Sequence, residues 1–343
     1  SVLFCTGWLA HRLAGVVLTD RSDASLPWLD IRSRSYSTEV LDILDMGWVE
    51  DLRPPLVDDL SVAGELTRSA AEDLGLEPGI PIVHAPFDCV SMALGAGVVS
   101  PGDTLVVLGT TLIVESVVTT VDTTDPPRGM TLCTGLPDTW LRLFGTYSGT
   151  DSINWMTHTL GLDSAAVYLD EAASSPPGAN GLRILPYFSP AGERAPFIDP
   201  RARASVVGLS LDHGRADLAR AHIEGLTYAL RHCVEQMPGT VDRLVVCGGG
   251  AASRLWCSLS ADVTGVQTRS LPDAELGAIG ADAAARAAAR KADVRALVRR
   301  PELDGTSFDP DPSTRDLYDD AYAQFHVLRD HARQSWHALR PSP

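Results

Sequence analysis

Apolar and polar residues follow one another along the chain in two patterns, one typical of strands and the other of helices. Apolar, mostly β-branched residues fill 104–108 and 112–118, and only Gly109, Thr110 and Thr111 separate the two runs. Two such runs joined by a short turn that contains glycine predict a β-hairpin. The same pattern predicts further strands at 81–84, 181–187 and 241–247.

Apolar residues three and four positions apart predict amphipathic helices between these strands. The longest helix is expected at 215–237. Shorter helices are expected at 3–13, 37–44, 90–97, 253–264 and 274–290. Expected strands and helices thus alternate through much of the chain.

The last part of the chain has two features of its own. The helix expected at 274–290 is rich in alanine, and Gly277 and Gly280 lie one turn apart in it. Small residues on one side of a helix let a neighbouring backbone approach closely. The tail from Arg299 is rich in proline and aspartate before a last helix at 316–339, and we expect it to be a peripheral appendage.

Composition and charge narrow the class of protein. The chain has 343 residues, of which 45% are apolar, so it can form a full core and roughly two domains. Its net charge of −16 repels phosphate backbones and anionic lipid surfaces, so neither nucleic acid nor a membrane is expected as a partner. The six cysteines form no CxxC pair, and most lie within apolar runs. We therefore expect a protein of the reducing cytoplasm.

Histidine spacing predicts no metal site. None of the nine histidines lies four residues from another, which is the spacing of a helical pair of metal ligands. The start of the chain is informative in a different way, because Ser1 takes the place of an initiator methionine and already belongs to an apolar helical pattern. We expect a fragment of a longer parent chain.

Several short segments, in the same order, resemble the FGGY family of carbohydrate kinases. They are TDRSDAS at 19–25, Asp88 followed by ALGAG at 93–97, PGD at 101–103 leading to GTT at 109–111, GERAP at 192–196, ADLAR at 216–220, and GGGA at 248–251. The resemblance implies an actin-like (ribonuclease H-like) ATPase fold of the α/β class. It also implies part of an N-terminal domain at 1–97 and a complete C-terminal nucleotide-binding domain at 98–343, with a helical tail from about 299.

The resemblance implies ATP-dependent phosphorylation of a sugar hydroxyl, with ATP and Mg²⁺ as cofactors. A ketose or a polyol is the expected substrate, and a pentulose such as xylulose is favoured. The family's opening strand and Asp-Gly-Thr turn, its first phosphate hairpin, do not open this sequence. A non-catalytic nucleotide-binding or sugar-binding remnant of a truncated kinase is therefore an alternative. The oligomeric state stays open, with a homodimer among the alternatives.

The resemblance makes Asp88 the candidate general base, at the mouth of a cleft between the two domains. Asp88 follows the apolar run 81–84, which predicts a buried strand, and precedes the helix at 90–97. A carboxylate at this position can accept the proton of a sugar hydroxyl during phosphoryl transfer. The alternative is an aspartate that only caps the helix. The segment HAPFDC at 84–89 departs from the family's glycine-rich pattern, which leaves the sugar unidentified.

Gly109, Thr110 and Thr111 resemble the family's second phosphate hairpin. Glycine lets a phosphate group approach the backbone, and the threonine hydroxyls add hydrogen-bond donors. The alternative is an ordinary hairpin, whose turn would more often contain Asn-Gly or Asp-Gly.

Gly248, Gly249 and Gly250 join an expected strand to an expected helix and resemble the family's adenosine loop. A nicotinamide-dependent dehydrogenase is the competing hypothesis. However, the sequence GGGAAS does not fit GxGxxG, and no acidic residue ends the next expected strand at 266–269. The sequence therefore favours a nucleotide over a dinucleotide.

The resemblance also puts Gly149, Asn154 and Arg254 beside the base and ribose, with ordinary surface polarity as the alternative. If one ATP occupies both glycine turns, the two turns must line the same cleft. The hairpin turn should then lie closer to Asp88 than the adenosine loop does.

Two further pairs of charged residues belong to the resembling segments. Glu193 and Arg194 lie in the GERAP segment, and we expect them to hold a loop over the cleft rather than to take part in chemistry. Asp20 and Asp23 lie in the TDRSDAS segment, and we expect them to shape a turn near the cleft.

Overall fold

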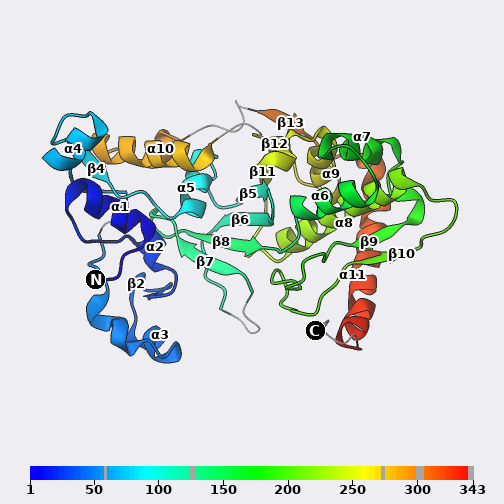
Figure 1. Cartoon of the computed structure of the whole chain (residues 1–343), viewed down its shortest axis with the longest axis horizontal. Helices are drawn as coiled ribbons and strands as arrows, with labels where there is room; N and C mark the ends of the chain where they lie inside the picture. The colour runs from blue at the N-terminus through cyan, green and yellow to red at the C-terminus, as the bar shows by residue number, and fades with distance from the viewer. Residues whose placement is uncertain (58–59, 124–127, 272–274, 299–304, 339–343) are drawn as a thin grey trace.

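The computed structural model describes residues 1–57, 60–123, 128–271, 275–298 and 305–338. A seven-stranded mixed sheet organises most of them, in the strand order β13-β12-β11-β5-β6-β8-β7 (Figure 1). Its strands are β5 (Asp103–Leu108), β6 (Leu112–Val118), β7 (Met130–Cys133), β8 (Trp140–Gly145), β11 (Arg243–Cys247), β12 (Thr268–Ser270) and β13 (Thr306–Phe308).

The centre of the sheet confirms the predicted hairpin. β5 and β6 pair antiparallel, with Leu108 opposite Leu112 across the turn. On its other side β5 pairs with β11 in parallel, and Val107 lies opposite Cys247. The carboxyl ends of neighbouring parallel strands meet at the same edge of a sheet, so the turns that follow β5 and β11 lie together.

Helices cover both faces of the sheet. Alternate side chains of the strands point to opposite faces, so Val106 and Val114 belong to one core and Leu105 and Val117 to the other. The first face packs against α6 (Thr150–Thr159), α7 (Ala165–Ser174), α8 (Arg215–Glu235), α9 (Arg254–Thr264) and α11 (Arg315–Ala338). The second face packs against α5 (Asp88–Gly95) and α10 (Leu276–Arg290).

The long helix α11 corrects the prediction of a peripheral appendage, which was wrong. Four of its buried apolar side chains recur at helical spacing and join the core of the first face, namely Tyr318, Tyr322, Phe325 and Trp336. The Trp336 ring meets Tyr187 edge-on, with centroids 5.4 Å apart. This stripe gives α11 a core role, because burying an aromatic side chain removes a large apolar area from water.

Helices α5 and α10 pack backbone against backbone. A Cβ atom added at Gly95 would lie 1.9 Å from the carbonyl oxygen of Leu276, and one at Gly280 would lie 1.8 Å from that of Ser91. Gly277 differs, because a Cβ there would lie 3.9 Å from the nearest side-chain atom, Cγ of Met92. The close approach predicted for the glycine-containing helix is thus confirmed at Gly280, and its partner is α5.

Residues before α5 form smaller units, at the end of the molecule opposite α11 (Figure 1). Their elements are α1 (Cys5–Ala14), α2 (Arg21–Ala24), β1 (Leu29–Asp30), β2 (Ser35–Tyr36), α3 (Thr38–Ile43), η1 (Gly47–Leu52), β3 (Val62–Glu65), α4 (Arg68–Leu74) and β4 (Pro81–Val83). β4 pairs with β3 in a two-stranded sheet, and its residues are exposed or half-buried. The prediction of a buried strand was therefore wrong, because so small a sheet cannot enclose a strand.

The remaining described elements are β9 (Arg183–Leu185), β10 (Ser205–Val207), η2 (Ala179–Gly181), η3 (Gly249–Ala252), η4 (Val294–Ala296) and η5 (Pro312–Thr314). Within the described ranges, no helix has the length and apolar character needed to cross a bilayer.

Candidate functional site

The turn between β4 and α5 carries Asp88. Phe87 occupies the N-cap position of α5, and Asp88 is the first residue inside the helix. The Asp88 carboxylate is exposed and accepts a hydrogen bond from the amide of Cys89, with 2.7 Å between Oδ1 and N. Asp88 therefore does not occupy the N-cap position that the capping hypothesis assigned to it, and its carboxylate faces solvent.

A cavity of about 680 Å³ lies beside Asp88. Its lining comes from α5 (Asp88, Met92), from β5 (Val107), from the end of β11 and the turn after it (Cys247, Gly248, Gly249), and from the start of α10 (Glu275, Leu276, Gly277, Ala278). The cavity brings the candidate base together with the predicted adenosine loop, although Asp88 and Gly248 are 160 positions apart in the sequence.

The two predicted glycine turns touch one another at one edge of the sheet. Gly248 has a φ of 83°, in the left-handed region that favours glycine. A Cβ at Gly248 would lie 3.0 Å from the carbonyl oxygen of Leu108 and 3.5 Å from the amide nitrogen of Gly109. Gly250 lies deeper, because a Cβ there would lie 2.7 Å from the Trp256 ring. Gly248 and Gly249 are thus the members of this loop that reach the cavity.

The hairpin turn lies next to this cavity without lining it. Thr110 is exposed and Thr111 is half-buried, and residues 109–111 are absent from the lining of the cavity beside Asp88. The order of distances expected for one shared ATP, with the hairpin closer to Asp88 than the adenosine loop, stays a prediction.

The start of α6 packs on the hairpin turn. A Cβ at Gly149 would lie 2.6 Å from the carbonyl oxygen of Gly109 and 2.5 Å from that of Thr110. The amide of Thr150 donates a hydrogen bond to the Gly109 carbonyl, with 2.8 Å between N and O. Gly149 therefore lies directly against the predicted phosphate turn, and no side chain would fit between the two segments.

Asn154 and Arg254 lie farther from the cavity lining. Asn154 is exposed on α6, and Arg254 opens α9 with its guanidinium 5.5 Å from the Phe308 ring centroid. Neither residue lines the cavity beside Asp88. Asp151 and Ser152, from the predicted segment 149–154, line a different cavity of about 370 Å³.

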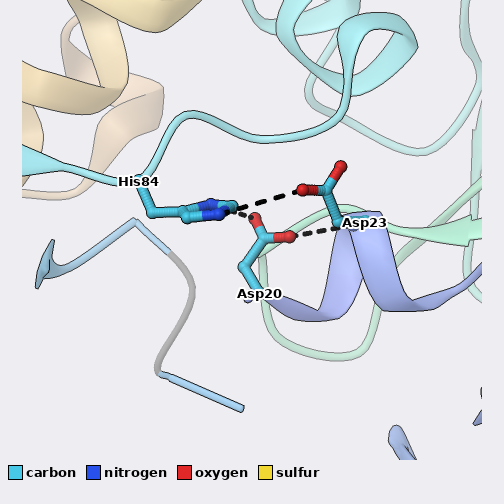
Figure 2. Close-up of side chains that lie close together, drawn as sticks. All are labelled: Asp20, Asp23 and His84. Atoms are coloured by element: carbon cyan, nitrogen blue, oxygen red, sulfur yellow. Dashed lines mark hydrogen bonds and ion pairs between the residues drawn. The ribbon is translucent and has the colours of Figure 1, made fainter. Parts of the chain in front are cut away.

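Sequence reasoning did not group one buried cluster close to Asp88, the trio of Asp20, Asp23 and His84. Figure 2 shows the His84 ring pointing toward both carboxylates of the α2 turn. The distances are 3.7 Å from Nδ1 to Oδ2 of Asp20 and 3.8 Å from Nε2 to Oδ2 of Asp23. In the described part of the chain, this trio is the group of carboxylate and imidazole ligands close enough together to hold a metal ion.

The buried trio also supports the turn that carries Asp88. Asp20 is the N-cap residue of α2, and its Oδ1 accepts a hydrogen bond from the Asp23 amide at 2.8 Å. The Ser22 hydroxyl donates to the Asp20 carboxylate at 2.9 Å and accepts from the Phe87 amide at 2.8 Å. The expectation that the two aspartates shape a turn is confirmed, and the turn they shape is hydrogen-bonded to the residue before Asp88.

The charges of the trio depend on one another. Burial acts to lower the pKa of His84, but the Asp20 and Asp23 carboxylates outweigh it and raise that pKa above its usual value. Burial raises the pKa of Asp23 to about 6, the hydrogen bond from the Thr6 hydroxyl opposes the rise, and Asp20 adds to it. The arrangement therefore favours a protonated imidazole between two carboxylates.

Glu115 is a second acidic residue that the sequence analysis missed. It lies on β6, is fully buried, and points to the face of the sheet that α5 covers. Burial raises the pKa of Glu115 to about 8, the Cys89 thiol opposes the rise, and the Asp88 carboxylate adds to it. The sequence offered one indication of this residue. Glu115 is an acidic residue within the otherwise mostly apolar run 112–118, whose side chains are expected in the core.

Glu193 and Arg194 hold a loop, as expected, but each does so through the backbone of 145–147. Oε1 of Glu193 accepts hydrogen bonds from the amides of Tyr147 at 2.9 Å and Arg194 at 2.8 Å. Nε of Arg194 donates to the Gly145 carbonyl at 2.7 Å. Burial raises the pKa of Glu193 to about 7, and the three backbone amides it binds oppose that rise.

The arrangement suits transfer chemistry on an anionic ligand. An exposed carboxylate faces a cavity whose floor includes turns without side chains, so backbone N–H groups can approach a ligand closely. The Thr110 and Thr111 hydroxyls add donors beside that floor.

Comparison with known families and proteins agrees with this architecture. The model of the C-terminal domain of the FGGY family of carbohydrate kinases matches residues 104–289, and the model of its N-terminal domain matches residues 1–95.

Individual relatives match over most of the chain. Xylulose kinase of Staphylococcus epidermidis is 31% identical over 337 residues, which cover 95% of this chain and 66% of that protein. Erythritol kinase of Brucella abortus is 30% identical over 298 residues, covering 82% of this chain and 57% of that protein. The crystal structure of a xyloylose kinase from Brucella ovis superposes with a TM-score of 0.89 at 26% identity, covering 99% of this chain and 69% of that one. The chain therefore spans less than two thirds of the length of both curated relatives.

Proposed function

Because the chain belongs to the FGGY family of carbohydrate kinases, we propose that it supplies the general base and the nucleotide-binding surface of an ATP-dependent kinase for a sugar or polyol hydroxyl. Its α/β architecture is the actin-like (ribonuclease H-like) ATPase fold that the sequence predicted. One observation carries the proposal: Asp88 and the glycine turn 248–249 share one cavity, and the hairpin turn touches Gly248.

Asp88 is proposed to accept the proton of the acceptor hydroxyl. Phosphoryl transfer needs little covalent help from a protein, so an oriented carboxylate and an aligned phosphate supply most of the catalysis. The exposed position of Asp88 and its place beside the cavity support this role. The hydrogen bond between Ser22 and the Phe87 amide supports it further, because it restrains the turn from which Asp88 projects.

The nucleotide is proposed to lie across the two glycine turns. Residues 109–111 would bind the phosphates through backbone N–H groups and hydroxyls, with Gly149 behind them, and 248–250 would carry the adenosine. Arg254 and Asn154 remain proposed neighbours of the base and ribose. Bound Mg²⁺ would neutralise charge on the transferring phosphoryl group. Besides the proposed base, Glu275 is the acidic residue of the cavity lining that could reach it directly or through water.

A ketose or polyol is the proposed acceptor, with a pentulose such as xylulose favoured. The match to a xylulose kinase over 95% of the chain supports the pentulose. The match to an erythritol kinase keeps the polyols among the acceptors to be tested. We further propose that residues 1–97 belong to the sugar-side domain and residues 98–343 to the nucleotide-side domain.

A screen of ADP release tests the proposal. Purified protein with ATP and Mg²⁺ is offered pentuloses, other ketoses, erythritol and glycerol, and we expect ADP release with one acceptor class. Thermal shifts of the chain with ATP and with NAD serve as the control, and ATP should give the larger shift. No ADP release with any acceptor would favour the non-catalytic remnant, and stabilisation by NAD alone would contradict the nucleotide assignment.

A further inference from the structure

A second cavity, on the opposite face of the sheet from Asp88, is lined by three arginines. Its volume is about 360 Å³, and Arg329 and Arg333 reach it from α11 while Arg128 reaches it from the segment before β7. Phe197, Ile198 and His232 complete the part of the lining that matters here. α8 and α11 belong to the first face of the sheet, whereas α5, which carries Asp88, covers the second.

The arginines are held in place by neighbours that leave N–H donors unused. Nε and Nη2 of Arg329 lie 3.0 Å and 2.8 Å from Oδ1 of Asp330. Nη1 of Arg128 donates to Oε1 of Gln236 at 2.6 Å. Nε of Arg333 lies 3.7 Å from Oδ2 of Asp199, beyond hydrogen-bond distance. Because a guanidinium carries five N–H donors, these contacts leave donors on all three side chains.

The lining of this cavity carries three positive charges although the protein is strongly acidic, and from outside the lining Asp330 and Asp199 pair with two of them. No aspartate or glutamate occurs among the described residues that line it. The protein as a whole has a net charge of −16, so three arginines around one hollow are a local exception. His232 lies among these arginines. Burial lowers the pKa of its imidazole to about 3, and the charges of Arg329, Arg128 and Arg333 contribute to the lowering.

An apolar wall beside the arginines adds a second requirement for the ligand. The guanidinium carbons of Arg329 and Arg333 lie 5.7 Å and 5.1 Å from the Phe197 ring centroid, within the range of cation–π attraction. Ile198 is 59% exposed next to that ring. An apolar surface at the mouth of a basic cavity suits a ligand that carries an organic body as well as an anionic group.

We propose that this arginine cavity binds a small organic phosphate, with Arg128, Arg329 and Arg333 as its anchors. Arginine forks match phosphate oxygens in pairs, and three guanidiniums offer more donors than the two oxygens of a single carboxylate can use. The volume falls in the range of small-molecule sites. The proposal does not depend on the kinase function, because the cavity shares no lining residue with the one beside Asp88.

Titration calorimetry with two probes, inorganic phosphate and phenyl phosphate, tests the proposal. Both are titrated at constant ionic strength with ADP at saturating concentration, so that a phosphate site at the glycine turns is already filled. Phenyl phosphate should bind more tightly than inorganic phosphate, because its ring can contact Phe197 and Ile198. Equal affinities would mean that the site takes free phosphate, and the organic part of the proposal would be wrong.

Charge-removing variants locate the binding. Arg333→Gln and Arg329→Gln should each weaken phenyl phosphate binding about ten- to a hundredfold, the factor that a charge-assisted hydrogen bond represents. Arg315→Gln is the matched control, because Arg315 lies on the same helix, loses the same charge and does not line the cavity. The Arg333 side chain is 44% exposed, so its replacement should leave the fold intact, which the melting temperature checks.

Two results would overturn the proposal. One is the absence of heat from either probe at millimolar concentration with the wild-type chain. The other is an equal loss of affinity in Arg315→Gln and Arg333→Gln, which would mean that only the overall charge matters.

Discussion

The two ends of the molecule bury their side chains in different ways. Residues from β5 onward enclose two continuous apolar cores, one on each face of the sheet. Residues before α5 belong instead to three small apolar clusters, one of which also includes Cys133 of β7, and they expose Trp8, Ile43 and Trp48 at 54%, 76% and 69%. Their polar trio of Asp20, Asp23 and His84 is nevertheless as buried as the sheet. The larger part is thus organised around two continuous apolar cores, whereas the smaller part combines small apolar clusters with one buried group of charges.

Asp88 lies where these two kinds of packing meet. Its turn is bound to the polar trio through Ser22, and its helix packs against α10 and the sheet. If the two regions divide the chemistry as proposed, changes on one side should alter proton transfer and changes on the other should alter stability or nucleotide binding. The following variants test that division.

The largest effect is expected from Asp88→Asn. Asparagine keeps the shape of the side chain but cannot accept the proton, so turnover should fall by a factor on the order of 10²–10⁴. ATP affinity should hardly change, because the glycine turns that would bind the nucleotide are untouched. Steady-state turnover and an ATP titration on this one variant measure both quantities, and near-normal turnover would remove Asp88 from the mechanism.

His84→Leu tests whether the small region depends on its buried charges. The variant leaves two buried carboxylates without their cationic partner, which should lower the free energy of unfolding by about 3–5 kcal/mol. Urea unfolding followed by tryptophan fluorescence measures the change, since Trp28 lies in a cluster of this region. His158→Leu, on the exposed surface of α6, is the control and should change little. A His84 variant as stable as that control would refute a stabilising role for the trio.

Gly280→Ala tests the contact between the two helices beside the cavity. The added methyl group would overlap the Ser91 carbonyl, so the free energy of unfolding should fall by about 3 kcal/mol. Gly277→Ala is the matched control on the same helix, because its Cβ has ordinary van der Waals space and alanine favours helix. Thermal unfolding of the two variants should differ in sign, and equal melting temperatures would contradict the backbone contact.

Glu115→Gln should change the pH dependence of stability. The pKa of Glu115 is about 8 in the folded chain and about 4.5 when unfolded. The folded state therefore holds this proton more tightly, so its contribution to stability is complete below the unfolded pKa and is lost as pH rises toward 8. Between pH 6 and pH 7.5 the wild type should lose ~2 kcal/mol that the variant does not lose.

The pH experiment contains its own control. Asp23 and His84 also have raised pKa values, so they too make the folded state less stable as pH rises, but they do so equally in both proteins. The difference between the two unfolding curves isolates Glu115. Parallel curves from pH 6 to pH 7.5 would show that Glu115 is ionised in the folded chain.

Local sequence patterns predicted which helices and strands this fold contains better than they predicted how deeply each of them is buried. The hairpin at 104–118 and the helix at 215–237 follow from spacing alone, because each is stabilised by contacts between near neighbours in sequence. The helix α11 was placed at the periphery because its preceding segment is rich in proline and aspartate. Its own stripe, Tyr318 to Trp336, was the better guide, since apolar residues that recur on one side of a helix indicate a core helix.

The residues of the candidate site also fall into two groups, those that local sequence could reveal and those that it could not. Glycine turns and an aspartate between a strand and a helix can be recognised locally, so Asp88, 109–111 and 248–250 could be selected before their positions were known. The trio could not, because 61 residues separate Asp23 from His84 and no helical period links them. The arginine cavity likewise combines a loop, a helix end and α11, which only the folded chain brings together.

The crossing of α5 and α10 limits how this protein could be re-engineered. Both helices line the cavity beside Asp88, yet at Gly95 and Gly280 their backbones touch with no side chain between them. A selection for bulkier acceptors can enlarge a binding site only by trimming side chains, and this crossing has none to trim. We expect such a selection to recover smaller residues elsewhere in the cavity lining, at Val107 of β5 or Met92 of α5, and to leave both glycines invariant in every surviving clone.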